Sequence, residues 1–309
     1  MAKTVKMSYT EDMSKPPHIY QHVHALRRDF YRMAPGKESL LALIDAAEVA
    51  EQVFDSNAIE NSTLSLEETE KILLQIDLDR FVSPREIFET KNLARVMEYV
   101  RAKALHEPLT LPMIERLHGM LLANIDESIA GRLRQSGEYV RVGSHIAPPP
   151  EGLRDALETM LGEFQAQSQE HIIRRLALLH LTFEHLHPFV DGNGRIGRVL
   201  NNYLLLREGY VPINIKFADR GEYYHAFADF DRQRTTARME TIVGRALTQS
   251  YHKRLAYLSG SPIQTLGDHA KERGLSHSNL LNKAARQTIP AFLEKGVWKI
   301  AVNPAEAAT

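Results

Sequence analysis

The sequence predicts an all-α protein whose helices are interrupted by one small β-hairpin and followed by a small mixed module. Apolar residues recur every three or four positions through much of the chain, as between Ile172 and Leu186, which is typical of amphipathic helices. The periodicity changes between Gly131 and Pro150, where strand-favouring residues flank Gly143-Ser144 and predict a hairpin. A chain of 309 residues is long enough for roughly two or three modest domains.

Composition narrows the class of protein. Lys and Arg total 38 against 39 Asp and Glu, so overall charge favours neither nucleic acid nor a membrane as partner. The sequence has no cysteine, which excludes disulfides and thiolate metal sites and suits a reducing compartment. The N-terminus, with Glu11 and Asp12, does not resemble a signal peptide, and the longest apolar run is interrupted by His180. We therefore expect a cytoplasmic protein without a membrane partner.

The N-terminal third is expected to be helical. Residues 1–35 are polar and proline-containing, which predicts a loose lead-in with a short helix, and the stretch 38–78 has few helix breakers before Ser62. Ser56 and Glu60 lie one helical turn apart, a spacing that in most proteins indicates an exposed helix face. A further helix is expected over 84–105.

Helix start signals organise the middle of the chain. Glu107-Pro108 ends one helix, and Thr110 as N-cap with Pro112 in the first turn begins the next, which runs to Leu122. An amphipathic helix is expected over 153–165, and another begins at Gly221. We place the start of the central domain near residue 108.

The stretch from His187 to Arg198 is predicted to be a loop between two helices. Pro188 disfavours helical geometry at His187, so the first helix ends there. The second helix begins after Gly192-Asn193-Gly194 and ends at Gly209.

This loop combines the groups that a polyphosphate site needs. The unpaired N–H groups at a glycine-rich helix start bind anions, and Arg195 and Arg198 can clamp further phosphate oxygens. Asp191 can hold a divalent cation, and His187 can accept a proton from an attacking group. Each feature alone is common in turns and on surfaces. Their combination within one loop favours a functional site.

Residues 187–198 match every fixed position of the signature His-Pro-Phe-x-Asp/Glu-Gly-Asn-Gly-Arg-x-x-Arg, and the chain thereby resembles Fic-domain proteins. The resemblance implies a Fic-type helical core and a transferase that moves AMP from ATP to a Ser, Thr or Tyr hydroxyl of a target protein or of itself. It implies His187 as the base and Asp191 as the ligand of Mg²⁺. It also implies contacts to ATP from Gly192, Asn193, Gly194, Arg195, Ile196, Gly197 and Arg198.

Three further stretches resemble Fic features. The residues from Ser56 to Asn61 are similar to an inhibitory motif, which implies that Glu60, with Ser56, pairs with Arg198 and competes with the γ-phosphate of ATP. The hairpin resembles the flap on which the target docks as an added strand, through Val140, Arg141, Val142, His145 and Ile146. Its alternative is an ordinary surface hairpin. Thr182 and either Tyr223 or Tyr224 are expected to contact the nucleotide, with core packing as the alternative.

The last sixty residues resemble a winged helix-turn-helix. Gly274 separates two expected helices, Ser276 is the N-cap of the second, and Gly296 would lie at the tip of the wing. Basic residues outnumber acidic ones from Tyr251 onward, which supports DNA binding through residues 262–300 only weakly. Docking of a protein, or formation of a homodimer, is an equal alternative.

We thus expect three domains: residues 1–107 with the inhibitory motif, 108–248 as the catalytic domain and 249–309 as the winged module. Within the same scaffold, phosphate transfer is disfavoured because Fic proteins with that activity carry Lys where this chain has Gly194. Transfer of UMP or phosphocholine, or removal of AMP with Glu60 positioning a water, remains open. From another class, the chain could be a DNA-binding regulator whose Fic domain modifies only itself.

Overall fold

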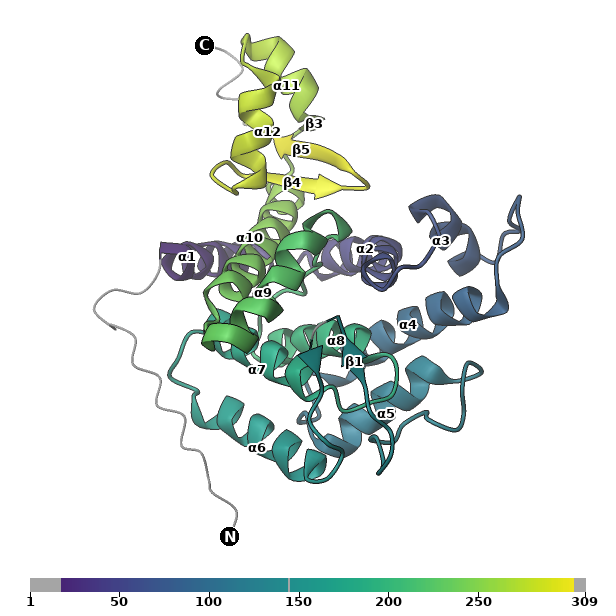
Figure 1. Ribbon diagram of the computed structural model, residues 1–309. Coiled ribbons are helices and arrows are strands. Elements are labelled where there is room, and N and C mark those ends of the chain that lie inside the picture. The colour runs from purple at the N-terminus through teal and green to yellow at the C-terminus, as the bar shows by residue number, and fades with distance from the viewer. Residues whose placement is uncertain (1–17, 144, 303–309) are drawn as a thin grey trace.

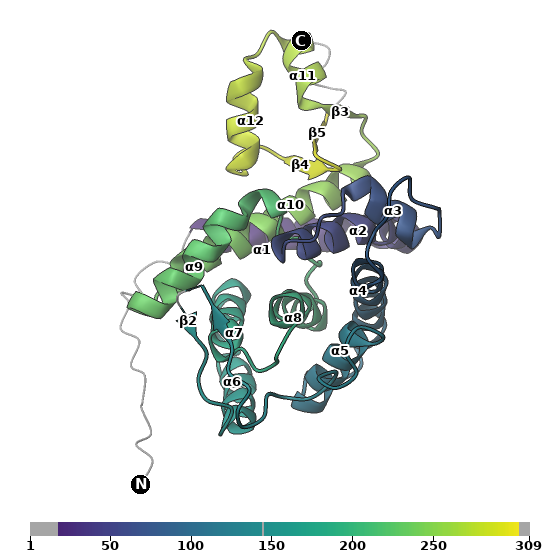
Figure 2. The same ribbon diagram turned by 45° about the vertical axis from the view of Figure 1, so that its right-hand side comes forward.

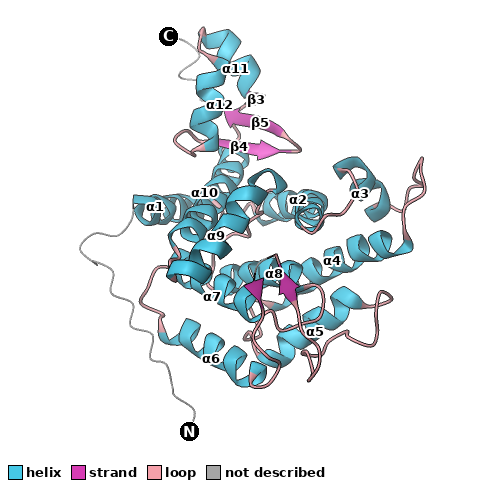
Figure 3. Cartoon of the chain, viewed as in Figure 1, coloured by secondary structure: helices cyan, strands magenta, loops and turns pink. Residues whose placement is uncertain are grey.

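The computed structural model describes residues 18–143 and 145–302, and these form an all-α protein, as predicted (Figure 1). The helices are α1 (His18–Met33), α2 (Glu38–Ile59), α3 (Leu66–Leu73), α4 (Pro84–Lys103), α5 (Leu111–Leu122), α6 (Leu153–Ala166), α7 (Ile172–Leu186), α8 (Asn193–Arg207), α9 (Arg220–Gln233), α10 (Ala237–Ser259), α11 (Leu266–Arg273) and α12 (His277–Ala285). A 3₁₀ turn, Phe217–Asp219, precedes α9. The strands form one hairpin and one small antiparallel sheet (Figure 3).

Helix α8 runs through the centre of the main helical body, where Figure 2 shows it end-on with α7, α4 and α2 around it. Ile196, Leu200 and Tyr203 on α8 are fully buried in the main apolar core. Because α8 is enclosed along its length, its N-terminus is held in a fixed position relative to the surrounding helices. That fixed N-terminus is where the candidate site lies.

The expected start and stop signals are present. The Thr110 side chain accepts a hydrogen bond from the Met113 N–H at 3.3 Å, and Pro112 lies in the first turn of α5. α7 ends at Leu186, and His187 follows in the left-handed conformation with φ of 46°. α8 ends at Arg207, and Gly209, with φ of 70°, follows its C-cap.

The N-terminal helix is longer than predicted. In place of a short helix, α1 has 16 residues and packs against α10, with Val23 fully buried and the Tyr20 hydroxyl donating to Glu240. Its apolar face is therefore part of the main core. The rest of the expected lead-in, residues 1–17, lies outside the described residues.

The hairpin is confirmed as two short antiparallel strands, β1 (Arg141–Val142) and β2 (His145–Ile146). A hairpin of this length has little stability of its own. Buried Arg134 anchors it, because its guanidinium donates to the carbonyl of Pro148 at 2.9 Å and to that of His187 at 2.7 Å. The same side chain thus ties the flap to the loop after α7.

The C-terminal residues form a module with a separate apolar cluster. Strands β3 (Ile263–Thr265), β4 (Ala291–Glu294) and β5 (Val297–Ala301) pair in the order β3-β5-β4 beside α11 and α12. The cluster joins Leu266, Leu280 and Ile300. Gly296 lies in the turn between β4 and β5, as expected.

The expected domain boundary at 248/249 falls inside α10, which continues unbroken to Ser259. The periodicity of α10 gave no stop signal before Gly260, whose φ of 68° ends the helix. Gly260 is thus the better boundary. The module sits on α10 through Lys253, whose ammonium lies 2.9 Å from Glu294. Within the described ranges, no helix combines the length and the apolar character needed to cross a bilayer.

Candidate active site

A cavity of about 740 Å³ opens at the N-terminus of α8. It is lined by the end of α2, the start of α4, the hairpin, the end of α7, the loop 187–195 and the inner face of α9. This volume lies within the usual range for small-molecule sites. The residues of the central motif and of the inhibitory motif, which are far apart in the sequence, therefore meet around one cavity.

His187 faces this cavity with one ring nitrogen available. Its Nδ1 lies 3.0 Å from the carbonyl oxygen of Glu184, and because a carbonyl only accepts, Nδ1 carries the proton. Nε2 then has a free lone pair. Burial lowers the pKa of His187 below its ordinary value, so the ring is neutral near pH 7. His187 is thus poised to accept a proton.

Gly192 allows the chain to enter α8. Its φ is 80°, and a Cβ there would lie 3.1 Å from the side chains of both Leu121 and Leu122. The Asn193 side chain has a different role from the one expected. Its Oδ1 accepts from the Phe189 N–H at 2.9 Å and its Nδ2 donates to the Phe189 carbonyl at 2.8 Å. The Asn193 side chain thus holds the loop in place. It is not free to bind an anion, which would be bound at this helix start by backbone N–H groups.

Glu60 lies directly over the start of α8. A Cβ at Gly194 would lie 2.2 Å from Glu60 Oε1, so the absence of a side chain at Gly194 creates the room for this carboxylate. A negative charge is favourable at a helix N-terminus. The Glu60 carboxylate thus occupies part of the region that the sequence assigned to phosphate.

Arg198 joins the two motifs. Its Nη2 donates to Glu60 Oε1 at 2.9 Å and to the Ser56 carbonyl at 2.8 Å, while Nε donates to the Ser56 hydroxyl at 2.9 Å. Nη1 lies 3.3 Å from the Tyr223 hydroxyl. Burial alone would lower the pKa of Arg198, but Tyr223 and Glu60 raise it above its usual range. Ser56 is 4% exposed, so the exposed-face interpretation of this stretch is wrong for Ser56.

Arg195 is held by two carboxylates, one of which the sequence did not suggest. It lies 3.1 Å from Glu89 on α4 and 3.4 Å from Asp191. Arg85, also on α4, contacts the other oxygen of Asp191. Glu89 and Arg85 precede the motif by about a hundred positions in the sequence. Nothing in their local sequence marks them, because only the packing of α4 against α8 brings them here.

Asp191 is ionised and partly accessible, with 37% of its side chain exposed. Burial raises its pKa, but Arg195, the Gly192 N–H and Arg85 together lower it below the ordinary value. Mg²⁺ binds through one or two carboxylates together with substrate phosphates. The donor at Asp191 therefore fits Mg²⁺ once the half-exposed Arg85 side chain moves away.

His118 supports this loop from α5, and the sequence did not identify it. Its ring stacks on Phe189 at 3.7 Å, its Nε2 donates to the Asp191 carbonyl at 3.0 Å and its Nδ1 accepts from the Gly131 N–H at 3.0 Å. Burial lowers the pKa of His118 to about 4, which keeps it neutral. A lone histidine on an apolar helix face gives no sequence signal for such a role.

Glu184 is a second group that sequence reasoning missed. Its side chain is 9% exposed, it lines the cavity, and its buried Oε1 has no hydrogen-bond partner. Burial, with the nearby charge of Glu60, raises the pKa of Glu184 to about 8. The group is thus protonated at neutral pH, one helical turn before His187.

Three residues expected to contact ATP do not line the cavity. Ile196 is fully buried in the core, and a Cβ at Gly197 would lie 2.3 Å from Glu184 Oε1, so Gly197 makes room for that side chain. Thr182 does not line the cavity either, because Leu181, Glu184 and His185 form the face of α7 that does.

The two tyrosines of α9 differ in their surroundings. Tyr223 is 1% exposed, and its hydroxyl lies 2.7 Å from His180 Nε2 in addition to its contact with Arg198. Tyr224 is 36% exposed and donates from its hydroxyl to the Ile59 carbonyl at 3.2 Å. Both line the cavity, but the Tyr224 ring is the more accessible one.

The hairpin borders the cavity through Val142, Gly143 and His145. Val142 and Ile146 are exposed apolar residues, and the short strands leave an unpaired edge. Arg141 turns back to the Gly143 carbonyl at 2.9 Å, and Val140 accepts a hydrogen bond from the Ala147 N–H at 3.1 Å. The geometry is compatible with an added strand.

Comparison with known proteins agrees with this geometry. Residues 108–205 match the model of the Fic/DOC family. Relatives with the name protein adenylyltransferase Fic include one from Aedes aegypti, 32% identical over 241 residues, which are 72% of this chain and 47% of the relative. Another, from Drosophila mojavensis, is 34% identical over 182 residues, 57% of this chain and 35% of the relative. The chain thus spans less than half the length of these relatives.

Solved structures share the fold. A Fic domain containing signaling protein from Bacteroides thetaiotaomicron gives a TM-score of 0.69 at 23% identity, covering 78% of this chain and 98% of that one. A Fic family protein from Desulfovibrio desulfuricans gives 0.65 at 20% identity, covering 96% and 99%. The second likeness extends over the C-terminal module as well.

The state of Glu184 predicts a pH dependence of stability. Above its ordinary pKa of 4.5 the unfolded state loses the Glu184 proton, while the native state keeps it up to about pH 8. Native stability therefore falls as pH rises through this window. Glu184→Gln cannot ionise, so its free energy of unfolding relative to wild type should rise between pH 5 and 9 by a few kcal/mol, since one pKa unit is about 1.4 kcal/mol.

Denaturant unfolding at several pH values measures this difference. The matched control is Glu158→Gln on the exposed face of α6, whose carboxylate is solvated before and after unfolding. A difference between Glu184→Gln and wild type that stays constant from pH 5 to 9 would contradict the raised pKa.

Proposed function

We propose that the protein is a protein adenylyltransferase of the Fic/DOC family, whose model residues 108–205 match, and that it moves AMP from ATP to a hydroxyl side chain. One observation carries this proposal: neutral His187, the amide-lined start of α8 and the two arginines Arg195 and Arg198 face one cavity. The acceptor would be a Ser, Thr or Tyr of a target protein or of this protein itself.

His187 would act as the general base. Its free Nε2 accepts the proton of the acceptor hydroxyl as that oxygen attacks the α-phosphate. The hydrogen bond from Nδ1 to the Glu184 carbonyl fixes the ring tautomer, so the lone pair stays on the cavity side. Pyrophosphate is the leaving group.

The start of α8 would hold the phosphates. Backbone N–H groups at Asn193 and Gly194 would hold the α-phosphate and stabilise charge that develops on it in the transition state. Arg195 would bind the β-phosphate and Arg198 the γ-phosphate. Both arginines are already desolvated, which strengthens such contacts.

Asp191 would hold Mg²⁺ against the phosphates, and the ion would supply neutralisation of their negative charge. For adenine we favour Tyr224, because its ring is accessible whereas Tyr223 is committed to Arg198 and His180. The target would dock on the edge of β1–β2 through backbone hydrogen bonds. Such bonds depend little on side chains, so the sequence of the target would be only weakly selected. The lack of cysteine supports the cytoplasm as its location.

Glu60 would inhibit this activity. Its carboxylate holds the Nη2 of Arg198 at 2.9 Å, so a γ-phosphate must displace it to reach the same donors. Gly194 argues against phosphate transfer, because the Fic proteins with that activity carry Lys at this position. Transfer of UMP or phosphocholine, or removal of AMP, would leave no label from the α-phosphate of ATP on protein. The labelling experiment below therefore separates these activities from AMP transfer.

Removal of the inhibitory carboxylate should raise transfer. With ATP labelled at the α-phosphate, Glu60→Gly should label itself or proteins of a cell lysate about tenfold more than wild type, because the lost contact is worth roughly 1.4 kcal/mol or more. The double variant Glu60→Gly/His187→Ala should lose the label by about a hundredfold or more, since general base catalysis contributes at least this much.

ATP labelled at the γ-phosphate is the control for the transferred group and should leave no label on protein. Equal α-label on Glu60→Gly and wild type would contradict inhibition by Glu60. Equal α-label on Glu60→Gly/His187→Ala and on Glu60→Gly would exclude His187 as the base. Label from the γ-phosphate would point to a kinase.

A second candidate function is DNA binding by the C-terminal module. One observation favours it: α12 exposes Ser278, Asn279, Asn282 and Lys283, which are polar groups suited to base edges and phosphates. Their alternative partners are a protein or a second copy of this chain.

A mobility shift on duplex DNA tests this candidate. Binding should weaken steeply between about 50 and 200 mM salt, because neutralised phosphates release counterions. Lys283→Ala should weaken binding, whereas Lys103→Ala, in the last turn of α4, should not. If no shift occurs even at low salt, the module does not bind DNA.

A further inference from the structure

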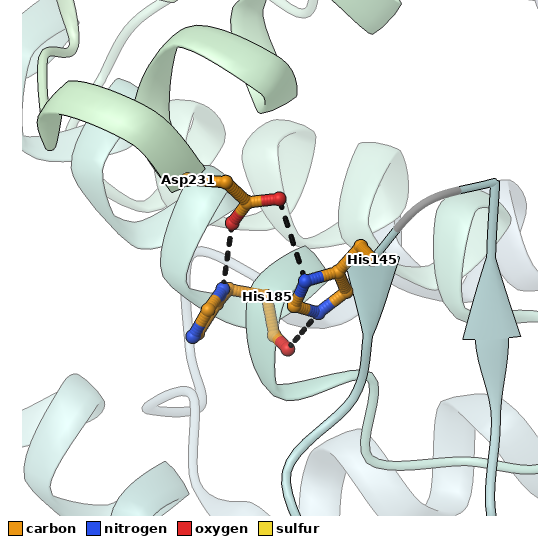
Figure 4. Close-up of side chains that lie close together, drawn as sticks. All are labelled: His145, His185 and Asp231. Carbon is orange, nitrogen blue, oxygen red and sulfur yellow. Dashed lines mark hydrogen bonds and ion pairs between the residues drawn. The ribbon is translucent and has the colours of Figure 1, made fainter.

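Three side chains from separate elements converge beside the flap (Figure 4). His145 lies on β2, His185 near the end of α7 and Asp231 on α9. Their ligand atoms all lie within 4.8 Å of one another. They border the cavity but do not belong to the 187–198 motif.

The hydrogen bonds of His145 leave an unsatisfied pair of acceptors. Its Nε2 lies 2.9 Å from the carbonyl of His185, so Nε2 carries the proton. In the neutral ring, Nδ1 is then a bare lone pair, and it faces Asp231 Oδ2 at 3.4 Å (Figure 4). Two acceptors at this distance repel each other unless a proton or a metal ion lies between them.

The spacing of His145 Nδ1 and Asp231 Oδ2 fits two ligand atoms of one metal ion. Zn²⁺ lies about 2.0–2.2 Å from imidazole nitrogen and carboxylate oxygen, which places tetrahedral ligand atoms roughly 3.3–3.6 Å apart. The 3.4 Å between His145 Nδ1 and Asp231 Oδ2 meets this spacing. The bond from His145 Nε2 to a backbone carbonyl is the outer-shell contact that orients a metal-binding histidine.

The second histidine completes the set. His185 Nδ1 lies 2.8 Å from Asp231 Oδ1, on the other side of the same carboxylate. A metal would bind His185 in the neutral tautomer whose proton is on Nε2, so that the ion replaces the hydrogen bond between Nδ1 and Asp231. Its side chain and those of His145 and Asp231 are 25%, 18% and 30% exposed, so an ion can enter from the solvent.

We propose that His145, His185 and Asp231 bind a divalent transition metal ion, with Zn²⁺ as the fitting chemistry. Two imidazoles and one carboxylate form a donor set that Zn²⁺ uses with a fourth position open. The ion cross-links the flap to α7 and α9. Because β1 and β2 have two residues each, such a link would fix the flap far more firmly than its own strand pairing.

Calorimetric titration of the EDTA-treated full chain with ZnCl₂ tests the proposal. Wild type should bind one more equivalent of Zn²⁺ than His145→Ala or Asp231→Asn, or bind it on the order of 100-fold more tightly. His225→Ala, which removes an exposed histidine from α9 outside the cluster, is the matched control and should bind as wild type does. The comparison also subtracts binding at His18 and His22 on α1, which all these proteins share.

Thermal melting gives a second readout that does not depend on catalysis. Zn²⁺ should raise the melting temperature of wild type and of His225→Ala, because it binds the native state, and should not raise that of His145→Ala. Because His145→Ala also loses the hydrogen bond to the His185 carbonyl, the zinc-induced shift of each protein is measured against its own melting temperature in EDTA. Equal zinc stoichiometry, affinity and melting shift in wild type and His145→Ala would overturn the proposal, as would no uptake by wild type.

Discussion

The buried guanidinium of Arg198 is the constraint on which the site depends. A charge of this kind costs several kcal/mol to desolvate unless hydrogen bonds satisfy it. Ser56, Glu60 and Tyr223 together provide four contacts, from the end of α2 and from α9. The central helix therefore depends on the end of α2 to satisfy this buried arginine. In the proposed function, nucleotide binding and its inhibition thus share one side chain.

The remainder of α2 is held firmly, so relief of the proposed inhibition does not require movement of the helix. Asp55 accepts from the Asn214 side chain at 2.7 Å and from the Phe217 N–H at 2.9 Å. Fully buried Arg254 of α10 binds Glu48 at 2.8 Å, near the middle of α2. Glu60, by contrast, lies at the C-cap beyond the last helical residue and is 37% exposed. Rotation of this one side chain is enough to free part of Arg198.

Sequence reasoning predicted what is local and missed what depends on packing. Caps, prolines and apolar spacing located the helices. The predicted loop between α7 and α8 is confirmed for residues 187–192, whereas residues 193–198 already belong to α8. Glu60 was paired with Arg198 through a resemblance, since no local rule links positions 138 residues apart. Glu184 and Glu89 were missed because burial and helix contacts give them their partners. Asn193 was assigned to phosphate, whereas its short amide side chain bonds the loop itself.

The central claim is that Glu60 and the γ-phosphate compete for the same donors of Arg198. ADP has no γ-phosphate, so the comparison of ATP with ADP isolates this competition. Equilibrium binding of both nucleotides should be measured for wild type and Glu60→Gly in the His187→Ala background, which prevents turnover. The account predicts that Glu60→Gly tightens ATP binding by about tenfold, or roughly 1.4 kcal/mol, and changes ADP binding less than about twofold. Equal changes for the two nucleotides, or none for ATP, would contradict it.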